Sequence, residues 1–249
     1  RSAKLDLAGT RLAFGKLLNG GQLCLSPDYV VVPEELEEQL IARVVKETQS
    51  MYPNITENED YAGIINERHF ARLQNYIDDA VAKGAKLTIV GAEKTRASDG
   101  NRRMPLHILQ NVNEDMLVMH EEIFGPVLPV MTYSDVSEVP DMIEPRRNPL
   151  AMYYFGKDNR EQEYLLSHVQ SGGVCINDIT LHYVQEDLPF GGVGASGMGA
   201  YHGPEGFRSL SHSRAIYSQT MIDVLPIVGA RPPFGGKFRK NISKILGSI

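Results

Sequence analysis

The sequence has few cysteines, no long hydrophobic run and no recognisable leader. Its 249 residues contain two cysteines, Cys24 and Cys175, which are too few for the disulfide framework of a small secreted domain and favour a reducing, cytoplasmic compartment. No stretch approaches the ~18 apolar residues that a membrane-spanning helix requires, so no transmembrane span is predicted. The chain opens on Arg1 with charged residues and no signal peptide, which indicates a fragment or a processed piece of a longer protein.

An excess of positive charge is also lacking. The formal net charge is −6 at pH 7, so nucleic acid is not an expected partner. There is no Cys-x-x-Cys pair, and the string His120-Glu121-Glu122 lacks the second histidine of a zinc protease. No metal site is therefore predicted. With 42% hydrophobic and 22% charged residues, the chain can bury a substantial core, as one large domain or two small ones.

Hydrophobic periodicity and turn residues divide most of the chain into alternating helices and strands. Helices are expected over 5–18, from Pro33 onward, from Asn66 to Gly84 and after Asp158. Asp158 is expected to cap the last of these helices, and Glu161, three residues later, to complete a capping box with it. Strands are expected over 29–32, 86–90, 105–112, 127–133, 150–156 and 174–177. This alternation predicts an α/β fold with an open, twisted, mostly parallel sheet flanked by helices. In particular, the helix, Gly84 and the strand 86–90 are interpreted as half of a parallel unit.

The last third of the chain has a different character. Glycines recur after Phe190 at positions 191, 192, 194, 197, 199 and 203, which predicts close approach between backbones or to a ligand. From Arg231 the chain holds basic residues and no acid. Such a tail is expected to be disordered or lightly docked, and contact with an anionic surface or membrane is the alternative. We therefore expect a domain over 1–187, a glycine-rich segment over 188–220 and a basic tail over 221–249.

Cys24 lies in the run Asn19-Gly20-Gly21-Gln22-Leu23-Cys24-Leu25-Ser26-Pro27-Asp28, between a predicted helix and a predicted strand. A thiol at such a junction can be exposed while its backbone is fixed, as a covalent nucleophile requires. A single cysteine is more often a small buried apolar residue. The residues alone leave both interpretations open.

Three strings together carry a family resemblance. They are 19–24 (NGGQLC), 121–127 (EEIFGPV) and 189–192 (PFGG). In order and spacing they resemble the C-terminal, catalytic half of the aldehyde dehydrogenase superfamily. Residues 189–212 (PFGGVGASGMGAYHGPEGFRSLSH) are most similar to the class 3, fatty-aldehyde and coniferyl-aldehyde branch. The resemblance covers residues 4 to about 218.

The resemblance implies a catalytic role for Cys24. Its thiolate would attack the aldehyde carbon, hydride would pass to NAD or NADP, and water would hydrolyse the resulting thioester, with the Cys24 N–H as one oxyanion donor. Glu122 matches the acid that binds the hydroxyls of the nicotinamide ribose, and Phe124 matches its aromatic neighbour. Asn177 matches an asparagine near the family's active site, and Phe190 is expected to shape the pocket. Cys175 matches no catalytic position and is interpreted as structural.

The flanking residues bear on the substrate. Leu23 and Leu25, with Phe190, favour a hydrophobic or aromatic aldehyde of the coniferyl-aldehyde kind. The expected partners are this small aldehyde and a second copy of the chain, because the branch favours dimers.

Other catalytic parts of the family are expected upstream of Arg1. They are the general-base glutamate, the second oxyanion donor and the cofactor-binding domain, so the chain is predicted to be inactive alone. Two alternatives remain open: a CoA-acylating relative, and a non-catalytic scaffold or oligomerisation module.

Overall fold

The computed structural model describes residues 1–92, 100–146 and 148–247. It divides into two units, Arg1–Leu210 and Ser211–Ile249, which are described separately below. The surface loop expected around residues 91–103 lies partly outside the described residues.

The larger unit contains a four-stranded sheet in the order β1-β4-β3-β2. Its strands are β1 (Val30–Pro33), β4 (Val127–Tyr133), β3 (Leu106–Gln110) and β2 (Lys86–Val90). β4 lies parallel to both β1 and β3, whereas β2 is antiparallel to β3. The interpretation of β2 as part of a parallel unit was therefore wrong. An antiparallel strand at the edge of a largely parallel sheet is common, and the local residue pattern does not encode strand direction.

A second, two-stranded parallel sheet consists of β5 (Ala151–Tyr154) and β6 (Gly173–Ile176). The mostly parallel α/β fold is confirmed, but the expected sheet is present as two pieces. Both β1 and β5 have a paired neighbour on one side only among the described residues.

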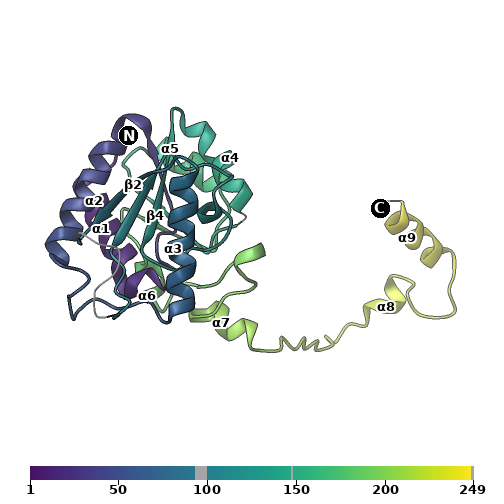
Figure 1. The fold of residues 1–249 in the computed structure, drawn as a ribbon. Coiled ribbons are helices and arrows are strands. Elements are labelled where there is room, and N and C mark those ends of the chain that lie inside the picture. Colours follow the sequence, from purple (N-terminus) through teal and green to yellow (C-terminus); the bar gives the residue numbers. More distant parts are fainter. Residues whose placement is uncertain (93–99, 147, 248–249) are drawn as a thin grey trace. The chain divides into compact units, whose positions relative to one another are not determined.

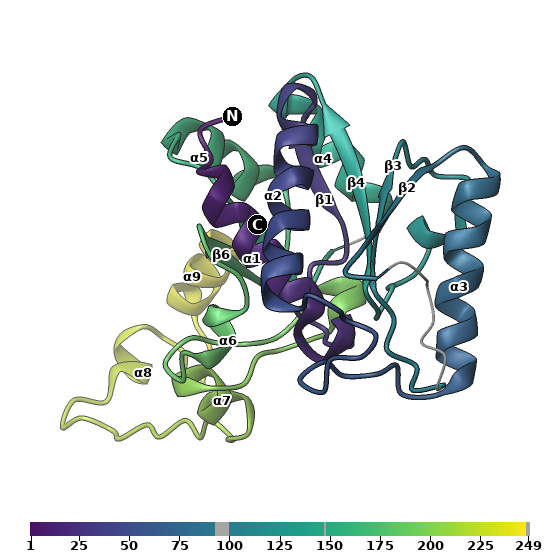
Figure 2. The same cartoon turned by 60° about the vertical axis from the view of Figure 1, so that its left-hand side comes forward.

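Helices cover both faces of the four-stranded sheet. Figures 1 and 2 show α1 (Leu5–Leu17) and α2 (Glu37–Met51) side by side on one face, with α3 (Glu67–Ala82) on the other. Each face has its own apolar core. The α1 and α2 side includes Leu12, Leu17, Leu40, Val44, Ile108 and Val130, and the α3 side includes Phe70, Leu73, Ile77, Leu109 and Val127.

Several element boundaries follow from capping side chains. Asn66 begins α3 as predicted, because its Oδ1 accepts the His69 N–H at 2.9 Å. Asp158 caps α5 (Asn159–His168) by accepting two backbone N–H groups. The expected return bond of a capping box is not made. Glu161 instead accepts the Tyr154 hydroxyl at 3.1 Å.

Other helical segments are short. A 3₁₀ turn, Glu34–Leu36, precedes α2. α4 (Val139–Ile143) is bounded by the 3₁₀ turns Val136–Glu138 and Glu144–Arg146. Pro145, in the second turn, disfavours continuation of the helix.

The glycine-rich segment packs by close backbone contact. It contains α6 (Leu181–Val184), the 3₁₀ turn Gly194–Ser196 and α7 (Gly203–Ser209). A Cβ on Gly191 would lie 2.0 Å from the Gly199 oxygen, and one on Gly192 would lie 2.1 Å from the Ser196 oxygen. Close backbone approach is therefore confirmed, and side chains at these two positions are excluded by space.

The smaller unit includes the tail over 221–249 that was expected to be disordered or lightly docked. Its described residues form two helices, α8 (Val224–Ile227) and α9 (Gly236–Leu246). None of the helices formed by the described residues combines the length and apolar character needed to cross a bilayer.

One charged side chain is completely buried beneath the larger sheet. Lys16, near the end of α1, has no exposed surface, and its Nζ has no hydrogen-bond partner among the described residues. Burial lowers the pKa of Lys16 to about 8, although the Asp28 and Glu122 carboxylates oppose this shift. The folded chain thus holds this ammonium at a cost in stability at neutral pH.

This cost predicts a pH-dependent stability. The unfolded pKa of a lysine is about 10.4, so between pH ~8 and ~10 the unfolded chain binds more protons at Lys16 than the folded chain does, and stability rises with pH. Over that interval the free energy of unfolding of the wild type should gain roughly 2 kcal/mol relative to Lys16→Met. Urea unfolding at both pH values measures this difference. Lys46→Met, at an exposed lysine of α2, is the control, and an equal response in both variants would contradict the prediction.

Candidate active site

The turn that leads to Cys24 is fixed by three consecutive left-handed residues. After α1, the 3₁₀ turn Leu18–Gly21 contains Asn19 at φ 52°, Gly20 at φ 63° and Gly21 at φ 73°. Asparagine and glycine are the residues that adopt this conformation readily. A Cβ on Gly21 would lie 2.5 Å from the Gly125 oxygen and 2.9 Å from the Lys16 oxygen. Glycine is thus required here by both conformation and space.

Gln22 anchors this turn to the loop before α3. Its Nε2 donates to the Asn19 oxygen at 2.9 Å and to the Gly63 oxygen at 3.2 Å. Its Oε1 accepts the Ile65 N–H at 2.9 Å. The nitrogen and the oxygen of the side-chain amide are therefore both bonded to backbone groups. These bonds hold Gln22, two residues before Cys24, in one orientation.

Cys24 lies at the tip of a tight turn. The Ser26 N–H donates to the Leu23 oxygen at 3.0 Å and closes the turn, and Leu25 turns inward with 7% exposure. The Cys24 side chain is exposed. Its own N–H donates to no acceptor among the described residues. An exposed thiol beside an available backbone donor suits a nucleophile whose product carries an oxyanion.

The loop with Glu122 and Phe124 is fastened beside the Cys24 turn. It follows the 3₁₀ turn Leu117–Met119. Asp28 Oδ1 accepts the Ile123 N–H at 3.0 Å, and Arg72 donates to the Ile123 oxygen at 2.6 Å and to the Glu122 oxygen at 3.4 Å. Phe124 has φ 50° and is 41% exposed. The loop therefore presents a carboxylate and an aromatic ring on a backbone held from two sides.

Charged groups around this loop influence one another, although only Lys16 is fully buried. Burial raises the pKa of Glu122, and the Asp28 carboxylate raises it further, while Lys16 and Arg72 oppose the shift. Burial also raises the pKa of Asp28, against the nearby Lys16 charge and the Ile123 N–H. Two carboxyl groups and two cations thus form one electrostatic cluster under the site.

A cavity of about 620 Å³ joins the two loops, because Cys24, Leu25, Asp28 and Glu122 all line it. Leu23, Phe124, Asn177 and Phe190 do not line this cavity, within the part of the chain that the structure describes. The cavity therefore brings together the proposed nucleophile and one proposed cofactor ligand, but not the whole predicted set.

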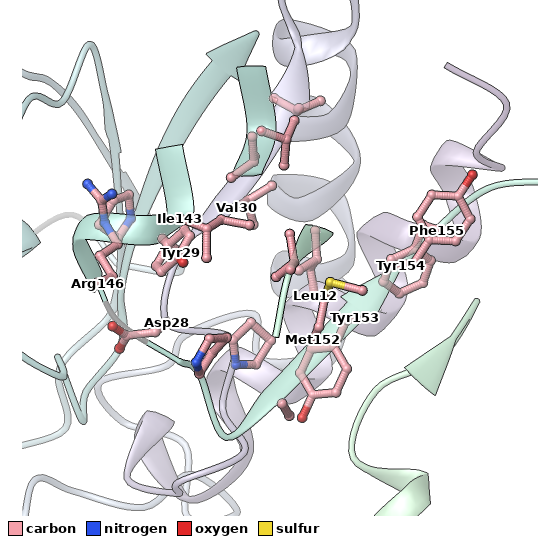
Figure 3. A pocket seen from close by; sticks show the side chains of 18 of the residues that line it. Leu12, Asp28, Tyr29, Val30, Ile143, Arg146, Met152, Tyr153, Tyr154 and Phe155 are labelled. Carbon is pink, nitrogen blue, oxygen red and sulfur yellow. The ribbon is translucent and has the colours of Figure 1, made fainter. Parts of the chain in front are cut away.

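Much of the cavity wall consists of strand edges. Residues 30–33 of β1 and 151–154 of β5 line it, on the sides where neither strand has a partner among the described residues. Figure 3 shows Tyr29 and Val30 on one side and Tyr153, Tyr154 and Phe155 on the other. This part of the cavity is a gap between two sheets. The region beside Cys24 and Glu122 is the part that bears on chemistry.

Tyr153 connects the Cys24 turn to the aromatic residues around Phe190. Its hydroxyl donates to the Leu25 oxygen at 2.8 Å, and its ring is 6.1 Å from His182. The His182 ring lies 5.9 Å from Phe190, which is 8% exposed and also packs on Tyr201. Phe190 thus reaches the site through two intervening rings.

Asn177 follows β6 in a left-handed conformation, with φ 57°. Its side-chain amide makes two bonds of 2.9 Å to Gly156, one with the N–H and one with the oxygen. These bonds join the ends of β5 and β6, so the amide has a structural role here.

Cys175 differs from Cys24 in exposure. It is 7% exposed, and its Sγ lies 3.2 Å from His182 Nδ1. Burial raises the pKa of the Cys175 thiol and lowers that of His182, so the pair is neutral at pH 7. Across the described ranges, no group of three or more His, Cys, Asp or Glu side chains is placed to hold a metal ion.

Sequence reasoning missed several residues that build the site. Lys16 is the single charge on the second half of an apolar helix, and Asp28 lies between Pro27 and an apolar strand. A charged residue next to apolar residues in this way is a local sequence signal of a buried or functional charge. Arg72 and Tyr153 gave none, because each contacts the site from a distant part of the chain.

Comparison with known sequences identifies relatives of this arrangement. The Aldehyde dehydrogenase family profile matches residues 1–216. A probable coniferyl aldehyde dehydrogenase of Pseudomonas aeruginosa is 44% identical over 245 residues, which is 98% of this chain and 50% of that protein. Mouse aldehyde dehydrogenase family 3 member A2 is 40% identical over 86% of this chain and 43% of its own length. The chain thus spans about half the length of these curated relatives.

The fold agrees with these sequence relations. The structure of AldH from Staphylococcus aureus, solved in a substrate-bound state, superposes with a TM-score of 0.83 and 33% identity, over 98% of this chain and 52% of that one. The glycine-dependent thiol turn, the neighbouring acid loop and both comparisons agree, and the chain belongs to the aldehyde dehydrogenase family.

Proposed function

We propose that this chain carries the reacting thiol of an NAD(P)-dependent aldehyde dehydrogenase that converts a hydrophobic or aromatic aldehyde to its acid. The observation that carries the proposal is the exposed Cys24, held at the tip of a fixed turn and lining the same cavity as Glu122. The domain that bears the thiol corresponds to residues 1–187, followed by the glycine-rich segment 188–220 and the tail 221–249.

Cys24 supplies the covalent chemistry. Its thiolate attacks the aldehyde carbon and forms a thiohemiacetal, and the Cys24 N–H stabilises the oxyanion. Loss of hydride converts this adduct to a thioester, which water cleaves to release the acid and restore the thiol. The rigid turn made by Asn19, Gly20 and Gly21 keeps the sulfur in place through both covalent states.

The acid loop fits a nicotinamide cofactor. Glu122 offers carboxylate oxygens that can accept hydrogen bonds from ribose hydroxyls, and the exposed ring of Phe124 can flank a planar base. When bound, the cofactor accepts the hydride. Asp28 and Arg72 keep the loop in the orientation that this binding requires.

The substrate class is inferred from the lining and from the relatives. Leu25, next to Cys24 in the cavity lining, provides an apolar contact. One relative is named 4,4'-diaponeurosporen-aldehyde dehydrogenase, at 35% identity over 96% of this chain, and others are named for coniferyl aldehyde. We further propose that the enzyme works as a homodimer.

The two thiols should react at different rates. At pH 7, iodoacetamide should modify Cys24 at least roughly tenfold faster than Cys175, because exposure and thiolate content govern alkylation. Intact-mass and peptide mass spectrometry measure both rates, with the urea-unfolded chain as the control in which the two thiols become equivalent. Equal rates in the folded chain would favour a non-catalytic scaffold.

An activated ester tests acyl transfer without a cofactor. p-Nitrophenyl acetate should transfer its acetyl group to Cys24, releasing p-nitrophenolate in a burst of about one equivalent per chain. Cys24→Ser should abolish the burst, and Cys175→Ser should retain it. Acylation mapped to Cys175 instead would overturn the assignment.

The role of Glu122 is tested in a preparation of the enzyme that oxidises aldehydes with NAD(P). Glu122→Gln should raise KM for NAD(P) roughly tenfold or more, because the neutral amide replaces a carboxylate and the charge-assisted hydrogen bonds to the ribose are lost. Glu121→Gln is the matched control, since that neighbouring acid accepts a hydrogen bond from the Tyr76 hydroxyl at 3.3 Å. A larger effect at Glu121 would show that the other acid binds the cofactor.

A further inference from the structure

The charges of this chain are strongly segregated. Residues 211–249 contain a single acid, Asp223, whereas the chain as a whole has a net charge of −6. The six cations of this segment are Arg214, Arg231, Lys237, Arg239, Lys240 and Lys244. Arg231 pairs with Asp223 at 3.3 Å. The rest of the segment is therefore cationic and presents no competing carboxylate side chain.

The helix α9 separates apolar from basic side chains. At the helical repeat, its apolar residues fall within an arc of about 100°. They are Phe238, Ile242, Ile245 and Leu246. Lys237, Lys240 and Lys244 fall on the opposite side, and Arg239 lies at the border. This is the pattern of an interfacial helix with a basic polar face.

The apolar side chains of this unit are extensively exposed. Ile245 is 60% exposed, Leu246 65% and Phe234 54%. In α8, Leu225 is 50% and Ile227 56% exposed. Exposed apolar side chains are thus concentrated in both helices of this unit and in the segment between them.

The two short helices are joined to each other. Asn241 Nδ2 of α9 donates to the Val228 oxygen, directly after α8, at 2.8 Å. The Phe238 ring of α9 also lies 4.5 Å from Phe234 in the connecting segment. Apolar and basic groups therefore belong to one structured body, which can present both to the same surface.

We propose that α8 and α9 dock on an anionic lipid surface, with the α9 apolar side in the headgroup–acyl boundary and the Lys and Arg side chains against lipid phosphates. A fluid bilayer accepts exposed apolar side chains without a preformed groove, and its anionic headgroups match a segment that lacks acids. Since neither helix spans a bilayer, the attachment is peripheral and reversible. It would place the enzyme where apolar aldehydes partition.

Vesicle co-sedimentation tests the proposal with the complete 249-residue chain. The chain should bind vesicles of equimolar phosphatidylglycerol and phosphatidylcholine, and bind pure phosphatidylcholine vesicles much more weakly. High salt should release it, because the Lys and Arg contribution is screened. Failure to bind the anionic vesicles, or equal binding to both kinds, would overturn the proposal.

Variants separate the two contributions. Lys237→Gln and Lys240→Gln should each lower vesicle binding roughly fivefold, and the double variant Ile242→Gln/Ile245→Gln should abolish it. Lys46→Gln, the same charge change on the exposed face of α2, should have no effect. Circular dichroism verifies that each variant is folded.

Other outcomes are also decisive. If the Ile242→Gln/Ile245→Gln chain binds vesicles normally but changes its sedimentation coefficient, the α9 apolar side covers protein and the proposal fails. Cys24 alkylation is measured on the same variants. It should remain unchanged, so a failure here is distinct from a failure of the proposed dehydrogenase function.

Discussion

The site depends on one close backbone contact between two loops that are about 100 residues apart in sequence. At Gly21 the chain passes so near the Gly125 oxygen that a Cβ would lie 2.5 Å from it. The left-handed turn of Asn19, Gly20 and Gly21 makes this approach sterically accessible, and the bond from the Ile123 N–H to Asp28 fastens it. The positions of Cys24 and Glu122 are thus fixed relative to each other by main-chain geometry.

Local chemistry made much of the fold predictable. The caps at Asn66 and Asp158, the glycines that follow α1, and the apolar strands 86–90 and 127–133 all have signals confined to a few residues. The direction of β2 and the division into two sheets depend on pairing between distant segments, and no local pattern records them. The helix α9 was not predicted, because cations without acids from Arg231 onward indicated a disordered or lightly docked tail, although α9 has a clear helical separation of apolar and basic residues.

The candidate site divides in the same way. Cys24, Glu122 and Phe124 were predicted from contiguous strings in the sequence, so each could be identified without knowledge of the fold. Tyr153 and Arg72 join the site through long-range contacts, so they became visible only in the structure. Lys16 shows a further difficulty: a lysine in a helix is usually solvated, and its burial between Asp28 and Glu122 follows from the packing of the Cys24 turn against the acid loop.

The unpaired edges of β1 and β5 have a consequence for assembly. Each edge presents main-chain donors and acceptors to the same cavity, which is the kind of surface that can pair with an extended segment. Among the described residues, these two edges are therefore where pairing with another chain is most favoured.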